Sequence, residues 1–343
     1  MRSLTKQEVI NVIEGKRTTE RIPNLCSFWI YPGSFEGQEE EMRQWLAEQA
    51  YDISVQGVRM PDVCRGTEED PEYCWLPAGR EGKTEGGIDS QVYLEDWEDT
   101  ELVEEMYAKF PSPDTANIFP GKEKIDHAKY VVGHWFYCLF ERQWSIRGME
   151  NALTDFYLYP EEVHRLYQKL TDFYIRIMER FREECGADGI FTSDDIGTQT
   201  GPFFSLEIFR TFFKPYYKQI IDKAHELGMH FWLHTCGNIT EIIGDLIECG
   251  LSVLHPIQKR TMDWDKVAAE WKGKIAFWVG MDVQDTLING SPEDVRKEVR
   301  LMRDTFDSPE GGFLYAAGNG IVGGTPIENI DAFLDEILTY GNG

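Results

Sequence analysis

Along most of the chain, short apolar runs alternate with longer stretches in which apolar positions recur every three or four residues. The short runs predict parallel strands buried on both faces, and the longer stretches predict amphipathic helices that cross back over the sheet. This alternation favours an α/β barrel. From residue 130 onward the predicted strands are 130–137, 189–193, 230–233, 251–254, 274–279 and 313–317, and the predicted helices include 160–185, 215–227, 239–249 and 292–306.

The first third of the chain has a weaker pattern. Residues 24–30 and 53–58 resemble strands and residues 39–51 a helix, which brings the predicted strands to the eight of a closed barrel. Residues 64–124 have no clear period and are rich in Gly, Pro and acidic residues, so we expect them to form an insertion that caps the barrel mouth. The sequence therefore predicts a TIM (β/α)8 barrel with an elaborated N-terminal region, in one domain over residues 1–343.

The charge and the cysteine content of the chain indicate which binding partners and which cellular location to expect. The chain has 60 Asp and Glu against 34 Lys and Arg, a formal net charge of −26, so its surface repels nucleic-acid phosphates and anionic lipids. We expect no nucleic acid and no membrane as partners. The N-terminal residues lack the apolar run of a signal peptide, and the seven cysteines are scattered and odd in number. These features predict a cytoplasmic protein with reduced thiols.

The ends of the predicted strands carry the candidate chemistry, because the active site of a TIM barrel lies where its strands end. His234 and Cys236 follow the fifth strand from the N-terminus and are two residues apart, so on an extended segment their side chains point the same way. An imidazole and a thiolate in that arrangement are typical zinc ligands, and a catalytic site adds a third ligand and an open position. The alternative is a buried, inert thiol beside a hydrogen-bonded core histidine.

Asp194 and Asp195 end the preceding strand and are catalytic candidates. Being adjacent, they point to opposite faces of an extended segment, so we expect one of them to enter the cavity as a general base, a ligand for a cationic group or a metal ligand. The alternative is a helix cap or an ion pair with Arg. His134 is a third catalytic candidate, although its strand is apolar and a structural histidine is the competing interpretation.

Other side chains at the strand ends are candidates for substrate binding. The aromatic residues would form an apolar wall for a flat ligand, or would simply belong to the core. The polar ones follow the last three predicted strands. The candidates are Trp29, Tyr31, Trp144, His255, Gln258, Asp282 and Asn319.

Four segments between about residues 133 and 337 resemble the uroporphyrinogen decarboxylase superfamily, which includes zinc methyltransferases that act on methyl-corrinoids. In order they read ECGADGIFTSDDIGTQTGP, AHELGMHFWLHTCGNI, GLSVLHPIQ and AAGNGIVGGTPIENI. Their order and spacing are similar to those of the family. The resemblance implies the TIM-barrel fold over this part of the chain, and the N-terminal third matches only loosely.

Two departures separate this chain from the true porphyrinogen decarboxylases. Those enzymes carry an arginine-rich N-terminal motif, whereas the stretch CSFWIYPGSFEG has no arginine, and Asn319 stands where they have a histidine. His234 and Cys236 match the zinc ligands of the methyltransferase branch, whose third ligand is a cysteine at the position of Asn319. The third ligand would then come from another side chain, with Asp194, Asp195, Glu141 and His255 as candidates.

The resemblance to the methyltransferase branch implies a zinc-dependent methyltransferase that moves a methyl group between a small methylated substrate, such as a methyl ether, and a corrinoid protein. The corrinoid would be carried by a separate partner, and the enzyme would be a monomer or a homodimer. Two alternatives stay open: a metal-independent decarboxylase of a smaller acid, and a ligand-binding barrel that has lost its chemistry.

Overall fold

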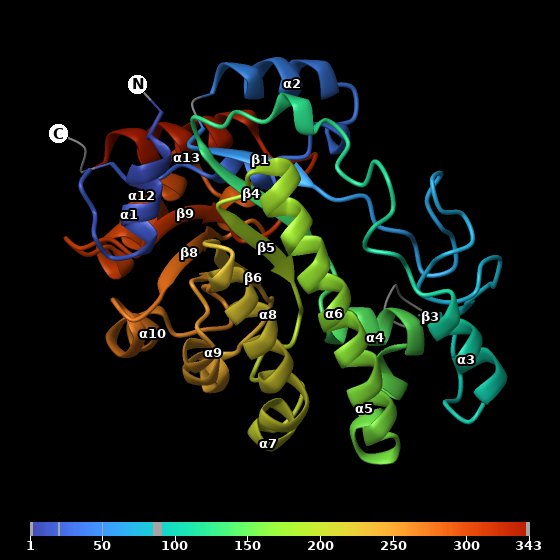
Figure 1. The fold of residues 1–343 in the computed structure, drawn as a ribbon. Coiled ribbons are helices and arrows are strands. Elements are labelled where there is room, and N and C mark those ends of the chain that lie inside the picture. Colours follow the sequence, from blue (N-terminus) through green and yellow to red (C-terminus); the bar gives the residue numbers. More distant parts are fainter. Residues whose placement is uncertain (1–2, 20, 50, 85–90, 341–343) are drawn as a thin grey trace.

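The computed structural model describes residues 3–19, 21–49, 51–84 and 91–340. In these ranges seven parallel strands, each paired with the next in chain order, form one curled sheet with helices on its outer face (Figure 1). The strands are β1 (Ile53–Gly57), β4 (Tyr130–Trp135), β5 (Gly189–Ser193), β6 (His230–His234), β7 (Val253–His255), β8 (Ala276–Met281) and β9 (Phe313–Ala317). Their residues are almost all buried, which explains the continuous apolar runs in the sequence.

The helices that connect the strands begin and end at signals in the sequence. Pro160 starts α6, and Gly186 in the left-handed conformation ends it. A capping box of Ser291 and Asp294, with Pro292 between them, starts α12. The crossover helices are α6 (Pro160–Cys185), α8 (Lys214–Glu226), α9 (Ile243–Cys249), α10 (Trp264–Trp271) and α12 (Pro292–Phe306), with α13 (Ile327–Thr339) after the last strand and α1 (Lys6–Ile13) and α2 (Glu39–Glu48) before the first.

The strand predicted at residues 24–30 is wrong, because Cys26–Trp29 forms a 3-10 helix. A strand would point Phe28 and Trp29 to opposite faces, whereas both rings pack into the barrel against Phe191 and Trp278. The segment still lies between the two edges of the sheet: Asn24 bridges β9, and the carbonyl of Asn24 accepts a hydrogen bond from the backbone N–H that precedes β1. An irregular segment thus takes the eighth position of the barrel.

The predicted insertion contains short elements of its own. Among its described residues are the hairpin strands β2 (Lys83–Thr84) and β3 (Gln91–Val92), the helix α3 (Thr100–Ala108) and a 3-10 turn at Lys122–Lys124. Strand β3 lies against α4 (Phe140–Arg147), the helix that follows β4, and α5 (Met149–Leu158) comes next in the chain. The insertion and α4 together therefore bound one side of the barrel mouth.

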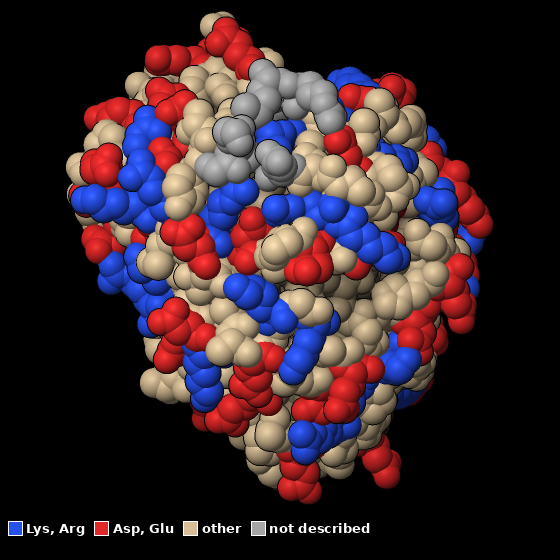
Figure 2. Space-filling view, turned by 90° about the vertical axis from the view of Figure 1, so that its left-hand side faces the viewer, with Lys and Arg blue, Asp and Glu red and all other residues tan. Residues whose placement is uncertain are grey.

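Positive and negative side chains alternate on the surface shown in Figure 2, where Lys and Arg are interspersed with Asp and Glu. The ion pair of Arg296 with Asp335 links α12 to α13. None of the helices within the described ranges is both long and apolar enough to span a bilayer.

Candidate metal centre

The ends of β5 and β6 bring Asp195, His234 and Cys236 together. His234 Nε2 lies 3.3 Å from Cys236 Sγ and 3.6 Å from Asp195 Oδ1, and the three ligand atoms are all within 4.8 Å of one another. Ligand atoms at ~2.0–2.3 Å from a tetrahedral zinc are themselves about 3.3–3.8 Å apart. The two measured separations match that spacing, so these three side chains fit a single zinc ion.

Two glycines allow the loops that carry these ligands to approach closely. Gly237 has a φ of +88°, and a Cβ there would lie 2.4 Å from the carbonyl carbon of Gly197. The backbone N–H of Cys236 donates to Asp195 Oδ1 at 2.7 Å. Asp195 is thus fixed to the loop that follows His234 and carries Cys236.

A hydrogen-bonded chain sets the tautomer of His234. His255 Nε2 lies 2.9 Å from the carbonyl oxygen of Ala317, which can only accept, so this nitrogen carries the proton. His255 Nδ1 is then an acceptor, and His234 Nδ1, 2.7 Å away, must donate to it. This leaves the lone pair of His234 Nε2 directed at Cys236 and Asp195, as a metal ligand requires.

The electrostatics of the cluster favour a bound cation. Burial, followed by the Asp195 and Glu141 carboxylates, raises the pKa of the Cys236 thiol. Burial also lowers the pKa of His234, which keeps its imidazole neutral. A thiol, a neutral imidazole and a carboxylate form a donor set in which a divalent cation would offset the negative charges and stabilise the thiolate.

Asp194 points away from the cluster, as expected for one member of an adjacent pair. Its buried carboxylate accepts hydrogen bonds from the backbone of Leu139 (3.1 Å) and Glu141 (2.8 Å) at the start of α4, and from the Tyr217 hydroxyl (2.6 Å). Burial raises the pKa of Asp194 to about 6, and these hydrogen bonds oppose that rise. Through these hydrogen bonds Asp194 holds the start of α4 in position. Its orientation does not support the catalytic role that the sequence suggested.

Three of the predicted substrate-binding residues line a cavity of about 440 Å³ beside the cluster: Gln258, Asp282 and Asn319. The amide nitrogens of Gln258 and Asn319 lie 3.7 and 3.6 Å from Cys236 Sγ. Asp282 accepts a hydrogen bond from Arg260 Nε at 2.7 Å. His255 contacts His234 on the side opposite the candidate ligands, so it acts as a support for His234 and not as a third ligand.

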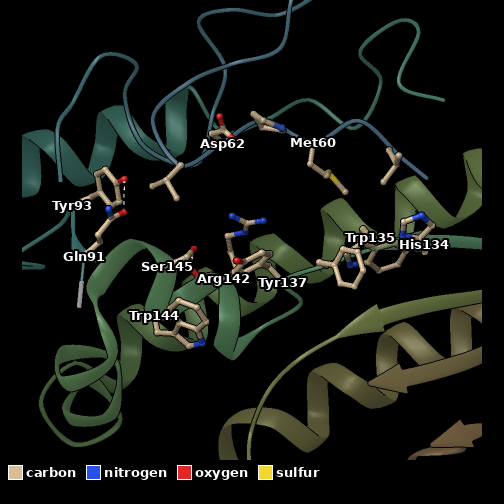
Figure 3. A pocket seen from close by; sticks show the side chains of 14 residues that line it. Met60, Asp62, Gln91, Tyr93, His134, Trp135, Tyr137, Arg142, Trp144 and Ser145 are labelled. Atoms are coloured by element: carbon tan, nitrogen blue, oxygen red, sulfur yellow. Dashed lines mark hydrogen bonds between the residues drawn. The ribbon is translucent and has the colours of Figure 1, made fainter. Parts of the chain in front are cut away.

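The predicted aromatic wall is dispersed over the structure. Trp29 is buried beneath the cluster and stacks on His255, with ring centroids 4.5 Å apart. Tyr31 is 42% exposed and borders a different cavity, of about 470 Å³, together with His134. Trp144 and His134 line yet another cavity, of about 500 Å³, on the α4 side of the mouth (Figure 3). Trp29 is therefore a core residue, and Tyr31 and Trp144 lie in separate cavities.

Two buried residues of α4 add to the site: Glu141, which the sequence offered only as a possible third ligand, and Arg142, which was not predicted. Glu141 is buried and accepts a hydrogen bond from Ser193 Oγ; burial, followed by Asp195 and Asp194, raises its pKa well above the usual range. Arg142 is also buried and lines the cavity of Figure 3. The signal in the sequence is the pair of adjacent charges within the otherwise uncharged, aromatic-rich segment Phe136 to Trp144.

His134 is expected to make the fold sensitive to acid. Burial lowers its pKa from 6.5 to about 4, so between these values the unfolded chain binds more protons than the folded one. Stability should fall by about 3 kcal/mol as the pH drops from 6.5 to 4, and His134→Gln should lack this component. Urea denaturation across this pH range measures it. The exposed His127→Gln variant should keep the wild-type profile, and an unchanged profile for His134→Gln would contradict the prediction.

Comparisons with known proteins agree with this architecture. The family model for uroporphyrinogen decarboxylase (URO-D) matches residues 143–340, more than half of the chain. The solved structure of a methyltransferase from Methanosarcina mazei superimposes with a TM-score of 0.60 over 98% of both chains, at 16% sequence identity. That likeness concerns the fold alone, and it confirms the predicted α/β barrel.

Curated relatives include two kinds of enzyme. A methylcobamide:CoM methyltransferase, MtbA, of Methanosarcina acetivorans is 27% identical over 180 residues, which are 52% of this chain and 50% of the relative. A uroporphyrinogen decarboxylase of Prochlorococcus marinus is 27% identical over 183 residues, 51% of this chain and 47% of the relative. The chain thus spans about half the length of the curated relatives it matches.

Proposed function

Because the chain belongs to the uroporphyrinogen decarboxylase (URO-D) family, we propose that it is a zinc-dependent methyltransferase that moves a methyl group between a small methylated substrate, such as a methyl ether, and a corrinoid protein. The observation that carries the proposal is the cluster of Asp195, His234 and Cys236 at the barrel mouth. Three protein ligands with a fourth position left for substrate are typical of catalytic zinc. The likeness to a methylcobamide:CoM methyltransferase supports the choice of reaction.

The side chains around the cluster have distinct tasks in this proposal. Bound zinc would supply a Lewis acid for a departing oxygen, or would keep a substrate thiol deprotonated. His255 holds His234 in the ligating tautomer, and Gln258 and Asn319 direct their amide N–H groups at the Cys236 sulfur. Burial, followed by the Asp195 and Asp194 carboxylates, raises the pKa of Glu141, which makes this carboxyl a candidate to hold or release a proton near Asp195.

The cavity beside the cluster is accessible from outside the barrel. Arg260 and Gln284, which line it, are exposed at the surface. A corrinoid carried by a second protein would therefore approach the cluster from the mouth, while the barrel wall and the buried Trp29 close the opposite side.

The test begins with the metal content of the protein purified without chelators, which should be about one zinc per chain. The zinc-loaded protein should transfer methyl groups from one or more of a panel of methyl ethers to a reduced corrinoid protein. Removing the zinc with a chelator should abolish transfer, and adding zinc back should restore it. A chain that neither contains zinc nor binds added zinc would contradict the proposal. Metal-independent release of carbon dioxide from a small acid would favour the decarboxylase instead.

A further inference from the structure

Arg142 occupies an unusual position on the α4 side of the barrel mouth. Its side chain is only 5% exposed, and its guanidinium carbon lies 4.1 Å from the ring centroid of Trp75 and 5.1 Å from that of Tyr137. Trp75 belongs to the insertion and is held by a hydrogen bond from its indole nitrogen to the Pro61 carbonyl, 3.0 Å long. The guanidinium is therefore fixed between two aromatic rings from different parts of the chain.

No carboxylate among the residues that the structure describes forms an ion pair with this guanidinium, although the neighbouring Glu141 carboxyl interacts with it electrostatically. Arg147, one helical turn further on, forms a buried bidentate pair with Asp155, but Arg142 forms no ion pair with a described residue, and its Nε has no hydrogen-bond partner there. Burial lowers the pKa of Arg142, and the Tyr174 hydroxyl opposes that change only in part. A buried guanidinium without a counter-charge is costly unless a ligand provides one.

The cavity beside Arg142 has room for such a ligand. Its volume is about 500 Å³, within the range of small-molecule sites. Figure 3 shows the guanidinium projecting from α4 toward the loop of Met60 and Asp62, with the ring of Tyr137 beside it. Much of the lining is aromatic, from Tyr93, Trp135, Phe136, Tyr137 and Trp144.

We propose that this cavity binds a small monocarboxylic acid with a flat, apolar body, and that Arg142 holds its carboxylate. A guanidinium presents parallel N–H donors that match the two oxygens of a carboxylate. The aromatic side chains would pack against the body of the acid. Binding of this acid does not depend on zinc; the further step of identifying it as the methyl-bearing substrate rests on the proposed function.

The charge balance of the cavity favours one negative charge over two. Among the described residues that line it, Arg142 is the only Lys or Arg, and Asp62 is the only Asp or Glu. Asp62 is already paired with Arg65, so it does not neutralise Arg142. A phosphate dianion would leave excess negative charge in a protein whose net charge is already −26.

Glu141 connects this cavity with the metal centre. Its carboxyl interacts electrostatically with Arg142 on one side and with Asp195 on the other, and the same carboxyl raises the pKa of Cys236. Glu141 precedes Arg142 on α4, and it accepts a hydrogen bond from Ser193, two residues before the candidate ligand Asp195.

The test compares benzoate with its neutral isostere benzamide by isothermal titration calorimetry on the full chain. Wild type should bind benzoate at least ~10-fold more tightly than benzamide, because a hydrogen-bonded charge is lost with the amide. R142Q should lose this preference, and R142K, which keeps the charge without the planar fork, should fall between them. The matched control is R260Q, since Arg260 lines the other mouth cavity but is paired with Asp282 and Asp285; it should bind benzoate like wild type.

Zinc content and the melting temperature of each variant show whether the fold is intact. Equal binding of benzoate and benzamide to wild type, or a benzoate preference retained in a folded R142Q, would overturn the inference. Inorganic phosphate that displaces benzoate at a similar concentration would overturn the choice of a monocarboxylate. If the protein lacks zinc and methyl transfer while the benzoate preference depends on Arg142, the proposed function fails and the carboxylate site stands.

Discussion

Cys236→Ala is expected to lower the zinc affinity of the protein by more than about 100-fold and to abolish methyl transfer. The substitution removes one of three candidate ligands and leaves His234 Nε2 and Asp195 Oδ1, 3.6 Å apart, to hold the ion alone. Asp195→Ala should cause a loss of similar size if Asp195 is the third ligand. Competition with a calibrated zinc chelator measures each affinity.

The matched control for this experiment is Cys249→Ala. Cys249 is a buried thiol on α9 whose Sγ contacts the Lys214 carbonyl, so its removal should leave zinc affinity unchanged. Wild-type affinity in Cys236→Ala would refute the metal centre. Wild-type affinity in Asp195→Ala alone would show that a different side chain completes it.

Asp155→Ala is expected to lower the free energy of unfolding by about 3–5 kcal/mol. Arg147 donates to Asp155 from Nε (2.9 Å) and from one Nη (2.8 Å), and both side chains are almost completely buried. Among the described residues, the substitution would leave the buried guanidinium with the Leu94 carbonyl and the Trp97 ring as its contacts, and no counter-charge. Urea denaturation monitored by tryptophan fluorescence measures the change.

Asp222→Ala provides the comparison, because Asp222 pairs with Lys218 on the exposed face of α8. Solvent screens that pair, so its loss should cost less than ~1 kcal/mol. Equal costs for the two substitutions would contradict the expectation that burial makes the Arg147–Asp155 pair the more costly one to break.

Much of the barrel could be predicted because the hydrophobic pattern of each strand and helix lies within that element's own sequence. The predicted ranges 189–193, 313–317, 160–185 and 292–306 coincide with β5, β9, α6 and α12, since buried parallel strands are apolar throughout and the two helices carry proline starts. Residues 24–30 were equally apolar, yet Phe28 and Trp29 both face the interior. Local hydrophobicity does not reveal which way two consecutive rings point, because that depends on Phe191 and Trp278, far along the chain.

The candidate site could be predicted only in part. The spacing of His234 and Cys236 was sufficient to place both side chains on one side of a strand end. The sequence left four candidates for the third ligand. Asp195 is favoured by its hydrogen bond from the Cys236 backbone, which forms only because two loops approach closely at Gly197 and Gly237. The adjacent charges of Glu141 and Arg142 stand out in the sequence, but they do not show that Arg142 lacks an ion-pair partner among the described residues or that it packs on the distant Trp75.

The orientation of the candidate metal ligand depends ultimately on a main-chain atom. The carbonyl of Ala317, at the end of β9, fixes the proton on His255 and through it the proton on His234. Every amino acid at position 317 has the same backbone carbonyl, so a substitution there would leave the protonated nitrogens of His255 and His234 unchanged. A shift in the register of β9 would move this carbonyl away from His255 and break the hydrogen bond. The pairing of the barrel strands therefore sets the orientation of the His234 imidazole. Side chains that line the neighbouring cavity can change without altering that orientation.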